Sequence, residues 1–599
     1  MQRFLSEKIS CFSRWIILCI LFLTFYVYFF SFNKFHLFYL EQTQLFRFSG
    51  DYFRPYFEKP GEFVFYLGEF LTQFFVNPFI GAGIITFLAA VTYFLSYFIF
   101  KKLGINTLVG SFIPALFIAA LQSDHQYQVG LTIGIILALL FSYLYLLLNN
   151  SYRLILGSIG WVFLYHLSGG FALLTSLLIV LFELFYFSSK TSLYRIITIL
   201  FLSVGIPYLG WKFIYLITFR DAWFYPFPFW GAHQILLFAG LLAYFPTIVL
   251  CLSGYKKFRK NEILNVPWSY KTILTGSVFI IAAFVYIEKQ AYDPKTEVLL
   301  GMDHSVQIGN WNKVIELSKV YPGKNQLILY YTNLALYKTG QMSERMFSFP
   351  QHGIDGLRLE WRRNEVAPFF GGEIYYHLNY FNEAYRWAFE SMVAKGINPR
   401  SLKRLVLTSL INGHYEIAAK YLNVLNQTLF YKDWAAKYRT YISDTSKINQ
   451  DEELSNKRKF LIKNDFISDA RDYNLGLKEL LQEHPDNRMA FEYQMAVFLL
   501  TKDINNFAAN IYRLKELKYR AIPVNYEEAL LFCMVYLKKD LVPEGYSIRP
   551  ETIQREKDYI AQLSRSGGNR QAAASELYNQ FGKTYWYYLH FAELTDKKQ

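Results

Sequence analysis

The sequence predicts an all-α protein in two parts, a polytopic membrane bundle of about nine spans followed by a soluble α-solenoid of helix pairs. Three observations support this prediction, of which the first two concern the bundle. Apolar runs of membrane-spanning length recur between residues 15 and 290, and the aromatic residues, 19% of the chain, concentrate before Lys289. The third observation is that similar amphipathic helix pairs recur from residue 291 onward. We therefore expect a transmembrane domain over residues 1–290 and an extracytoplasmic solenoid over residues 291–599.

Each predicted span is a run of roughly 20 apolar residues, the length that crosses a bilayer as a helix. The first run, residues 15–30, is rich in bulky aromatic residues and lacks a small-residue cleavage site, so we interpret it as a retained span. The fifth and sixth spans require a tight turn at residues 166–170; if that stretch is a kink in one helix instead, the topology reverses after it. The predicted spans start near Trp15, Phe79, Thr107, Val129, Leu154, Gly170, Ile196, Gln234 and Ile273.

Basic residues orient these spans, because lysine and arginine collect in cytoplasmic loops. They flank one set of span ends: Arg3, Lys8, Arg14, Lys101, Lys102, Arg153, Lys190, Arg195, Lys256, Lys257, Arg259 and Lys260. This distribution places the N-terminus in the cytoplasm of a bacterium and, with an odd number of spans, the second half on the periplasmic side of the inner membrane. It also accounts for the net charge of +14 without nucleic acid as a partner.

An outer loop and an interfacial helix are expected at residues 32–78, between the first two spans. Pro60 and Gly61 open an aromatic helix in which Glu62, Tyr66 and Glu69 recur at helical spacing, with Gln73 one turn further on. Phenylalanine and leucine cover the rest of its surface. Such a helix is suited to lie flat at the membrane interface with its polar stripe toward water or protein.

Polar residues at the outer ends of the spans are the candidate functional groups. We expect them to converge on one membrane face, because they follow odd-numbered spans or, for Lys212, lie within the outer part of the seventh span. A charge at bilayer depth, as at Lys212, is costly enough to suggest function. The alternative is that such loop residues are simply solvated and that Lys212 reaches the interface without a ligand. The candidates are Asp51, Arg54, Asp124, His125, His166, Lys212, Arg220 and Asp221. Glu183, at the opposite end, is expected to pair locally or to face water.

The second half repeats one helix-pair sequence pattern. Asn379 and Asn412 mark equivalent turns about one tetratricopeptide unit apart, and Pro322 and Gly323 mark another helix-pair turn. A solenoid of this kind presents a concave surface that binds a partner, or it serves as a structural lid. Cys533 is the only cysteine there, which excludes an intradomain disulfide or multi-cysteine zinc site in this half. The sequence also lacks a phosphate-binding P-loop and the HExxH and GxSxG motifs.

Residues 51–103 resemble the opening of the GT-C superfamily of membrane glycosyltransferases. The resemblance rests on a first span, an outer loop with Asp51, the sequence Pro60-Gly61-Glu62-Phe63 leading into an aromatic helix, and a second span that ends at Lys101 and Lys102. Some members carry a tetratricopeptide tail. The usual acidic pair is absent: Asp51 is followed only by Glu58 and Glu62. The overall layout is also similar to an uncharacterised family of bacterial inner-membrane proteins.

The resemblance implies transfer of a sugar from a polyprenyl-phosphate donor to an acceptor outside the inner membrane. Asp51, or secondarily Asp124, would be the general base, while Lys212 and Arg220 would stabilise the departing phosphate. Arg54, His125, His166 and Asp221 would complete the substrate site. The resemblance implies no definite cofactor, and a divalent metal bridging Asp51 to Asp124 or His125 is compatible with it. The solenoid would hold a protein or glycan acceptor.

Two other functions fit the same layout. A membrane-anchored tetratricopeptide-like scaffold would scatter the polar candidates, whereas an enzyme would bring Asp51, Asp124, Lys212 and Arg220 into one cavity. A lipid or glycan transporter would need a cavity that crosses the whole membrane rather than one open only on the outside.

Overall fold

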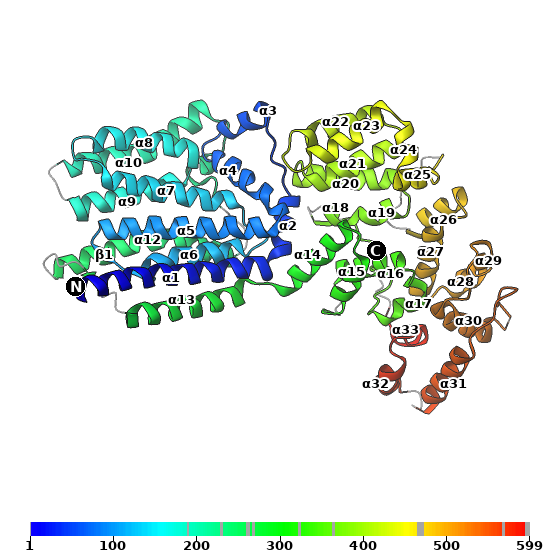
Figure 1. Cartoon of the computed structure of the whole chain (residues 1–599). Coiled ribbons are helices and arrows are strands. Elements are labelled where there is room, and N and C mark those ends of the chain that lie inside the picture. The colour runs from blue at the N-terminus through cyan, green and yellow to red at the C-terminus, as the bar shows by residue number, and fades with distance from the viewer. Residues whose placement is uncertain are drawn as a thin grey trace. The chain divides into compact units, whose positions relative to one another are not determined.

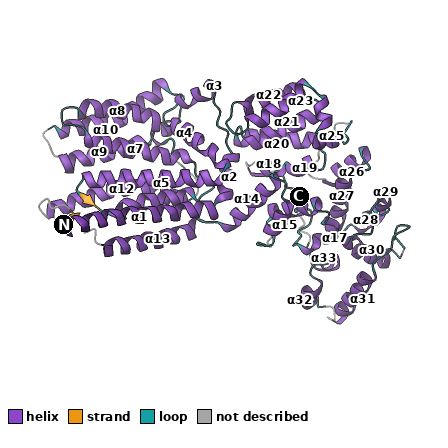
Figure 2. Cartoon of the chain, in the orientation of Figure 1, coloured by secondary structure: helices purple, strands orange, loops and turns teal. Residues whose placement is uncertain are grey.

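The computed structural model describes residues 2–187, 191–227, 232–258, 264–265, 270–321, 325–361, 366–463, 473–538, 540–565 and 569–593. Over these residues the chain is mainly helical, with connecting loops and one parallel pair of two-residue strands, β1 (Ile105–Asn106) and β2 (Leu264–Asn265). Figure 2 shows the same predominance of helix. The predicted all-α class is therefore confirmed. The predicted turn at Pro322 and Gly323, and the basic residues Lys190, Arg259 and Lys260, lie outside the described residues.

The chain forms two compact units. The first comprises Met1–Pro294 with Gln427–Phe430, and the second comprises Lys295–Asn426 with Tyr431–Gln599. The helices of the first unit are α1 (Gln2–Ser31), α2 (Lys34–Gln42), α3 (Gly50–Phe53), η1 (Arg54–Phe57), α4 (Phe63–Thr72), η2 (Gln73–Val76), α5 (Pro78–Lys102), α6 (Leu108–Gln122), α7 (Val129–Leu147), α8 (Arg153–Ser168), α9 (Phe171–Phe182), η3 (Glu183–Phe187), α10 (Ser192–Leu209), η4 (Gly210–Ile214), α11 (Phe219–Phe224), α12 (Ala232–Phe258) and α13 (Tyr270–Ala291).

Every predicted span of the first unit coincides with a helix, and these long helices run side by side (Figure 1). Three of them are long and apolar enough to cross a membrane: Pro78–Lys102, Val129–Leu147 and Ser192–Ile214. A bent pair, Leu18–Ser31 with Lys34–Gln42, is a fourth candidate if it forms one span. Shorter apolar helices lie at Phe63–Val76, Val109–Gln122, Phe171–Phe187 and Ile235–Cys251. The count of nine spans stays a prediction.

A tight turn, not a kink, separates α8 from α9. Gly169 adopts a φ of 57°, and the two helices pack against each other. The indole Nε1–H of Trp161 donates to the Ala172 carbonyl oxygen at 3.1 Å and to Ser176 Oγ at 2.7 Å. Trp161 lies eight residues before Gly169 and Ser176 seven residues after it, which is the pairing of an antiparallel hairpin.

The buried acidic residue Glu183 is locally satisfied within the bundle, as the sequence predicts. Glu183 is 0% exposed and pairs with Arg195, 5% exposed, at 3.1 Å between Oε2 and Nη1. Tyr145 and Ser192 donate hydroxyl hydrogen bonds to the same carboxylate, at 2.8 and 2.6 Å. Arg195 Nη2 also donates to the carbonyl oxygen of Asn150 at 2.9 Å. Because both charges are buried, loss of either partner would leave the other uncompensated.

The second unit consists of shorter helices joined by tight turns. They are α14 (Pro294–Gln307), α15 (Trp311–Ser318), α16 (Gln326–Lys338), α17 (Met342–Arg345), η5 (Met346–Ser348), α18 (Val366–Gly371), α19 (Glu373–His377), α20 (Phe381–Lys395), α21 (Pro399–Ile411), α22 (Tyr415–Asn426), α23 (Lys432–Ser443), α24 (Ser446–Gln450), α25 (Glu452–Arg458), α26 (Tyr473–Glu483), α27 (Arg488–Leu500), α28 (Ile504–Asn510), α29 (Arg513–Glu516), α30 (Val524–Leu537), α31 (Pro550–Arg565), α32 (Arg570–Phe581) and α33 (Tyr585–Phe591).

One turn type recurs through the second unit. A residue with positive φ ends a helix, and the next backbone N–H donates to the carbonyl oxygen five residues earlier, as in a Schellman motif. The donor and acceptor pairs are Asn310 and Ser305, Gln341 and Leu336, Tyr380 and Tyr375, His414 and Ser409, Asp503 and Phe498, and Tyr519 and Leu514. The two turns equated in the sequence are thus centred on Asn379 and Gly413, one residue later than Asn412 in the second case. The repeated turn is consistent with helix-pair repeats; a tetratricopeptide-like solenoid stays a prediction.

A partly buried cationic cluster lies beside Tyr376 in this unit. Lys457 Nζ lies 4.0 Å from the centroid of the Tyr376 ring, and the Arg404 guanidinium lies 3.6 Å from it. Lys457 Nζ also donates to the Tyr376 carbonyl oxygen at 2.8 Å. Burial, reinforced by the charge of Lys338, lowers the pKa of Lys457 to about 7. The folded chain therefore binds fewer protons than the unfolded chain between about pH 7 and the ordinary lysine pKa.

Replacement of Gly68 should test the packing of α4 on α7. A Cβ at Gly68 would lie 2.5 Å from the backbone nitrogen of Gly130, whereas a Cβ at Gly83 on α5 would meet nothing within 4 Å. We expect Gly68→Ala to destabilise the protein by about 1–3 kcal/mol, since backbone must move to admit the methyl group. Gly83→Ala should be neutral or slightly stabilising, because alanine favours helix. Melting in detergent measures both; equal midpoints for the two variants would contradict the close crossing.

Lys457 should make stability depend on pH. Its depressed pKa disfavours the folded state, and this cost is largest below about pH 7 and shrinks as pH rises toward the ordinary lysine pKa. Lys457→Gln should therefore raise the melting midpoint more at pH 6 than at pH 9. Lys459→Gln, at an exposed position on the same segment, should show no such difference. A pH-independent effect of Lys457→Gln would contradict the assigned titration.

Candidate functional site

Three loops that the sequence placed on one side of the bundle meet at one end of the first unit. The Gly61 N–H donates to the His166 carbonyl oxygen at 3.0 Å, and the Gly170 N–H donates to the Tyr225 carbonyl oxygen at 2.7 Å. A Cβ at Gly61 would lie 3.2 Å from Gly169 Cα, and a Cβ at Gly169 would collide with the Tyr225 carbonyl. Glycine is needed at positions 61 and 169, because each backbone has a positive φ and neither position has room for a Cβ.

The aromatic helix α4 forms a wall next to this junction. It crosses the start of α7 at Gly68 and Gly130, where a Cβ on Gly130 would come within 2.9 Å of the Val64 carbonyl oxygen. The absence of side chains at the crossing lets the two backbones approach closely. The polar residues of α4 consequently face α3, η1 and the loop after α11.

A cavity of about 750 Å³ opens among these elements. Its charged lining is predominantly acidic, with five carboxylates and two cations. The carboxylates are Asp51, Glu58, Glu62, Glu69 and Asp221, and the cations are Arg47 and Lys59. Aromatic side chains complete the walls: Tyr52, Tyr56, Phe65, Tyr225 and Phe227. A volume of this size holds a small organic ligand such as a sugar with its attached group.

Glu69 is the most constrained of the carboxylates. Tyr56 donates to Glu69 Oε2 at 2.9 Å, and Tyr52 donates to the same oxygen. Burial raises the pKa of the Glu69 carboxyl, although the two tyrosine hydrogen bonds oppose that change. The Arg47 guanidinium lies over the Tyr52 ring at 4.8 Å. Glu69 therefore fixes the positions of Tyr52 and Tyr56 in the cavity wall, whereas Asp51 and Glu58 are exposed to solvent.

A narrower groove of about 380 Å³ adjoins this cavity. The two share Lys59, Asp221 and Tyr225, and the groove continues along Leu216 and Ile217. Leu216 is 99% exposed, and Phe213 and Ile214 before it are each 71% exposed. The acidic cavity thus passes directly into an apolar surface, with Lys59 at the junction.

The structure brings together only some of the predicted site residues. Asp51 and Asp221 line the cavity. Arg54, in η1, and Arg220, in α11, are exposed and are not among its lining residues. The backbone of His166 holds the loop junction, while its ring nitrogen Nδ1 lies 3.1 Å from the Tyr215 hydroxyl.

Asp124, His125 and Lys212 also lie elsewhere. Asp124 Oδ1 lies 3.9 Å from His125 Nδ1, and the His125 ring packs on Tyr39 at 6.1 Å between centroids. Lys212 is exposed on η4, with Nζ 5.8 Å from the centroid of Tyr208. The expectation that Asp51, Asp124, Lys212 and Arg220 line one cavity is therefore corrected. The turn after α6 packs toward α2, and Lys212 faces outward from its π-helical turn.

Several residues of the cavity were not singled out from the sequence. Arg47 and Lys59 lie within the predicted outer segment at residues 32–78, and Lys59 directly precedes Pro60, so their position near that motif was an available signal. Glu69 was recognised only as part of a polar stripe. Among the residues that the structure describes, no group of three or more His, Cys, Asp or Glu is arranged to hold a metal ion.

The comparisons with known proteins place the chain in a family. The model of a family of unknown function, DUF6057, matches residues 9–592. The chain belongs to this family. No curated protein and no solved structure matches this DUF6057 chain. Its site is accordingly interpreted from its own geometry.

Proposed function

We propose that this DUF6057 protein is an integral membrane glycosyltransferase that moves a sugar from a polyprenyl-phosphate donor to an acceptor outside the bacterial inner membrane. Asp124, Lys212 and Arg220 do not line the cavity that contains Asp51, which is the arrangement expected of a scaffold, so the proposal does not rest on these residues. It is carried by the junction of a polar cavity with an apolar groove at Lys59, Asp221 and Tyr225. A lipid-linked sugar has the same sequence of chemical groups: a polar ring, an anionic phosphate and an apolar chain.

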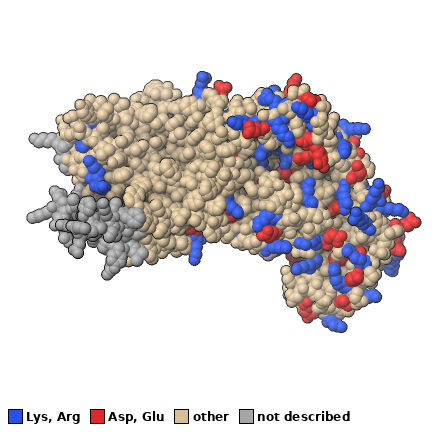
Figure 3. Space-filling model, viewed as in Figure 1, with Lys and Arg blue, Asp and Glu red and all other residues tan. Residues whose placement is uncertain are grey.

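The surface of the first unit supports a membrane location. Lys, Arg, Asp and Glu are sparse over the bundle in the view of Figure 3, whereas they are dense over the second unit. Exposed apolar residues line the outer faces of α8 and α10, including Ile155, Ile159, Phe163, Ile197, Phe201 and Val204. Such a band is expected where helices face lipid. In the proposed topology nine spans place the N-terminus inside and a tetratricopeptide-like second unit outside.

The cavity residues suggest a division of roles. The acceptor hydroxyl oxygen attacks the anomeric carbon, and the bond from that carbon to the phosphate oxygen breaks. Asp51, exposed within the cavity, accepts the proton of the acceptor hydroxyl. Lys59 and Arg47 stabilise the departing lipid phosphate in place of the cations first inferred, Lys212 and Arg220.

The position of the cavity favours transfer over transport. Its lining comes from loops, from short helices and from the first residues of α7, which are Val129 and Gly130. These elements belong to one end of the bundle. A transporter would require polar lining deeper along α5, α7 or α10, and the described lining contains no residue from the middle of those helices.

Replacement of Asp51 tests the proposed base. We expect Asp51→Asn to reduce transfer about 100-fold or more, because the acceptor loses its proton acceptor. Asp124→Asn is the matched control, since Asp124 lies outside the cavity lining. Mass-spectrometric profiling of envelope glycans and glycoproteins, in a deletion strain complemented with each variant at equal protein level, measures the effect. Normal glycosylation with Asp51→Asn, or equal loss with both variants, would reject the assignment.

Replacement of Lys59 tests the proposed phosphate contact. Lys59→Gln should lower transfer by about 100-fold, because the leaving phosphate loses a preorganised cation. Arg54→Gln removes a charge of the same sign from an exposed neighbouring position outside the lining and should have little effect. The same glycan profile reports the outcome. Comparable activity of the two variants would exclude Lys59 from the site.

A further inference from the structure

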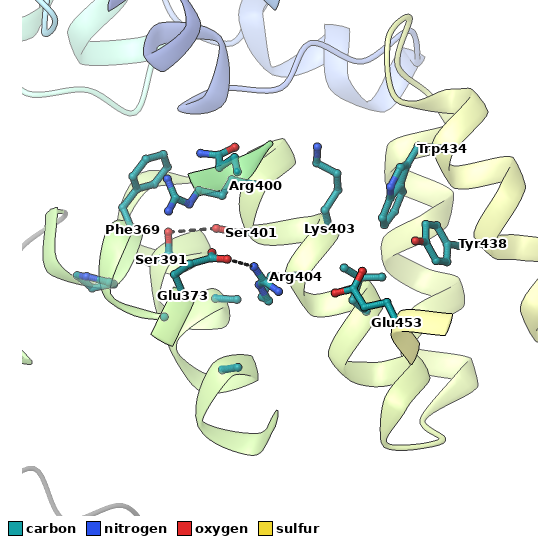
Figure 4. A pocket seen from close by; sticks show the side chains of 16 residues that line it. Phe369, Glu373, Ser391, Arg400, Ser401, Lys403, Arg404, Trp434, Tyr438 and Glu453 are labelled. Atoms are coloured by element: carbon teal, nitrogen blue, oxygen red, sulfur yellow. Dashed lines mark hydrogen bonds and ion pairs between the residues drawn. The ribbon is translucent and has the colours of Figure 1, made fainter. Parts of the chain in front are cut away.

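A second cavity lies within the second unit, where α20 and α21 face α23 and the start of α25. Its volume is about 260 Å³. In Figure 4 the side chains of Arg400, Lys403 and Arg404 extend from α21 on one side, and those of Trp434 and Tyr438 extend from α23 on the other. The volume is too small for a nucleotide or a large cofactor and matches one ring-sized unit with its substituents.

Three cations form one side of the cavity. Lys403 and Arg404 lie three and four residues after Arg400 on α21, and all three side chains line the cavity. Arg400 Nη1 donates to both carboxylate oxygens of Asp303, at 2.7 and 2.8 Å. Arg404 Nη2 donates to Glu373 Oε1 at 2.7 Å. These pairs fix the guanidinium groups and leave other N–H donors of each fork for a ligand.

The opposite side is aromatic. Trp434 and Tyr438 lie one helical turn apart on α23, with ring centroids separated by 4.4 Å. Phe369 closes the cavity near Arg400, whose guanidinium lies 4.7 Å from its ring centroid. Flat rings next to cations suit a ligand that has one apolar face and one anionic substituent.

The bottom of the cavity combines small residues with hydrogen-bond acceptors. Ala384, Ala388 and Ser391 recur along one face of α20, so a ligand can approach the helix closely. Ser401 donates to Ser391 Oγ at 3.1 Å. Glu373 and Glu453 add carboxylates to the lining. Glu373 Oε1 accepts from Arg404 and lies 3.2 Å from His377 Nε2, and Glu453 Oε1 accepts from the Tyr376 hydroxyl at 2.7 Å. The second oxygen of each carboxylate can still accept a ring hydroxyl.

We propose that this cavity binds one anionic sugar unit of a glycan, with its acid group on the Arg400, Lys403 and Arg404 face and its ring against Trp434. The lining favours a sugar over an acidic peptide because the flat Trp434 ring and a volume for one ring suit the face of a pyranose, whereas an acidic peptide side chain presents no such face. The inference rests on the proposed function only for the role of the glycan as acceptor. Binding itself is independent of transfer.

The test is equilibrium binding to the full chain in detergent, measured by isothermal titration calorimetry with trigalacturonate as the probe. Trigalacturonate should bind at least about tenfold more tightly than the neutral maltotriose, because a charge-assisted hydrogen bond is lost with the carboxylate. Lys403→Gln should weaken trigalacturonate binding by about tenfold, for the same reason. Lys432, also on α23, is exposed and does not line the cavity, so Lys432→Gln should leave trigalacturonate binding unchanged.

Trp434→Ala provides a second measurement on the aromatic side and should weaken both sugars. Equal melting midpoints of Lys403→Gln and Lys432→Gln show that folding is intact. Triglutamate that binds as tightly as trigalacturonate would overturn the proposal in favour of a peptide site. Absence of trigalacturonate binding, or binding unaffected by Lys403→Gln, would also overturn it. Because transfer is not measured, this result is separate from the outcome with Asp51→Asn.

Discussion

Close backbone contact at glycine is the constraint on which the candidate site depends. The loops of Gly61, Gly169 and Tyr225 touch through backbone atoms, and α4 touches α7 through Gly68 and Gly130. Any Cβ at these points would separate segments that are distant in sequence. Since the cavity lies among these segments, its shape follows from two crossings without side chains. The hydrogen bonds at the loop junction also satisfy backbone groups that would otherwise be costly to bury.

Acidic side chains of the first unit occur in two environments, one buried and paired and the other exposed. Glu183 is neutralised within the bundle by Arg195 and by two hydroxyl donors, so it contributes to packing without facing solvent. Asp51 and Glu58 instead remain exposed in an acidic cavity. The difference follows from cost: a buried charge is tolerated only with a complete set of partners. Polar residues without such a set therefore collect at one end of the helices, where water and ligands can reach them.

Local sequence signals predicted the elements but not their contacts. Asn77 followed by Pro78 is a helix start, and α5 begins there, with the Asn77 side chain accepting from the Phe79 N–H. The Gly169-Gly170 turn and the junction of outer loops were also anticipated. Asp124 was misplaced because nothing local reveals that its turn packs on α2, where the His125 ring contacts Tyr39. Likewise, helical spacing grouped Glu62 with Tyr66, whereas only Glu62 lines the cavity and Tyr66 packs among Phe46, Phe53 and Tyr56.

The charges of the cavity also fix the direction in which a lipid-linked sugar would enter. A phosphate is repelled by the carboxylates of the interior and attracted to Lys59, which stands where the polar cavity meets the apolar groove. With the phosphate there, the lipid chain extends along Leu216 and Ile217, and the sugar extends toward Asp51. The reverse orientation would place an apolar chain among five carboxylates and a polar ring on exposed leucine. Electrostatics and hydrophobicity therefore favour the same orientation for the proposed donor.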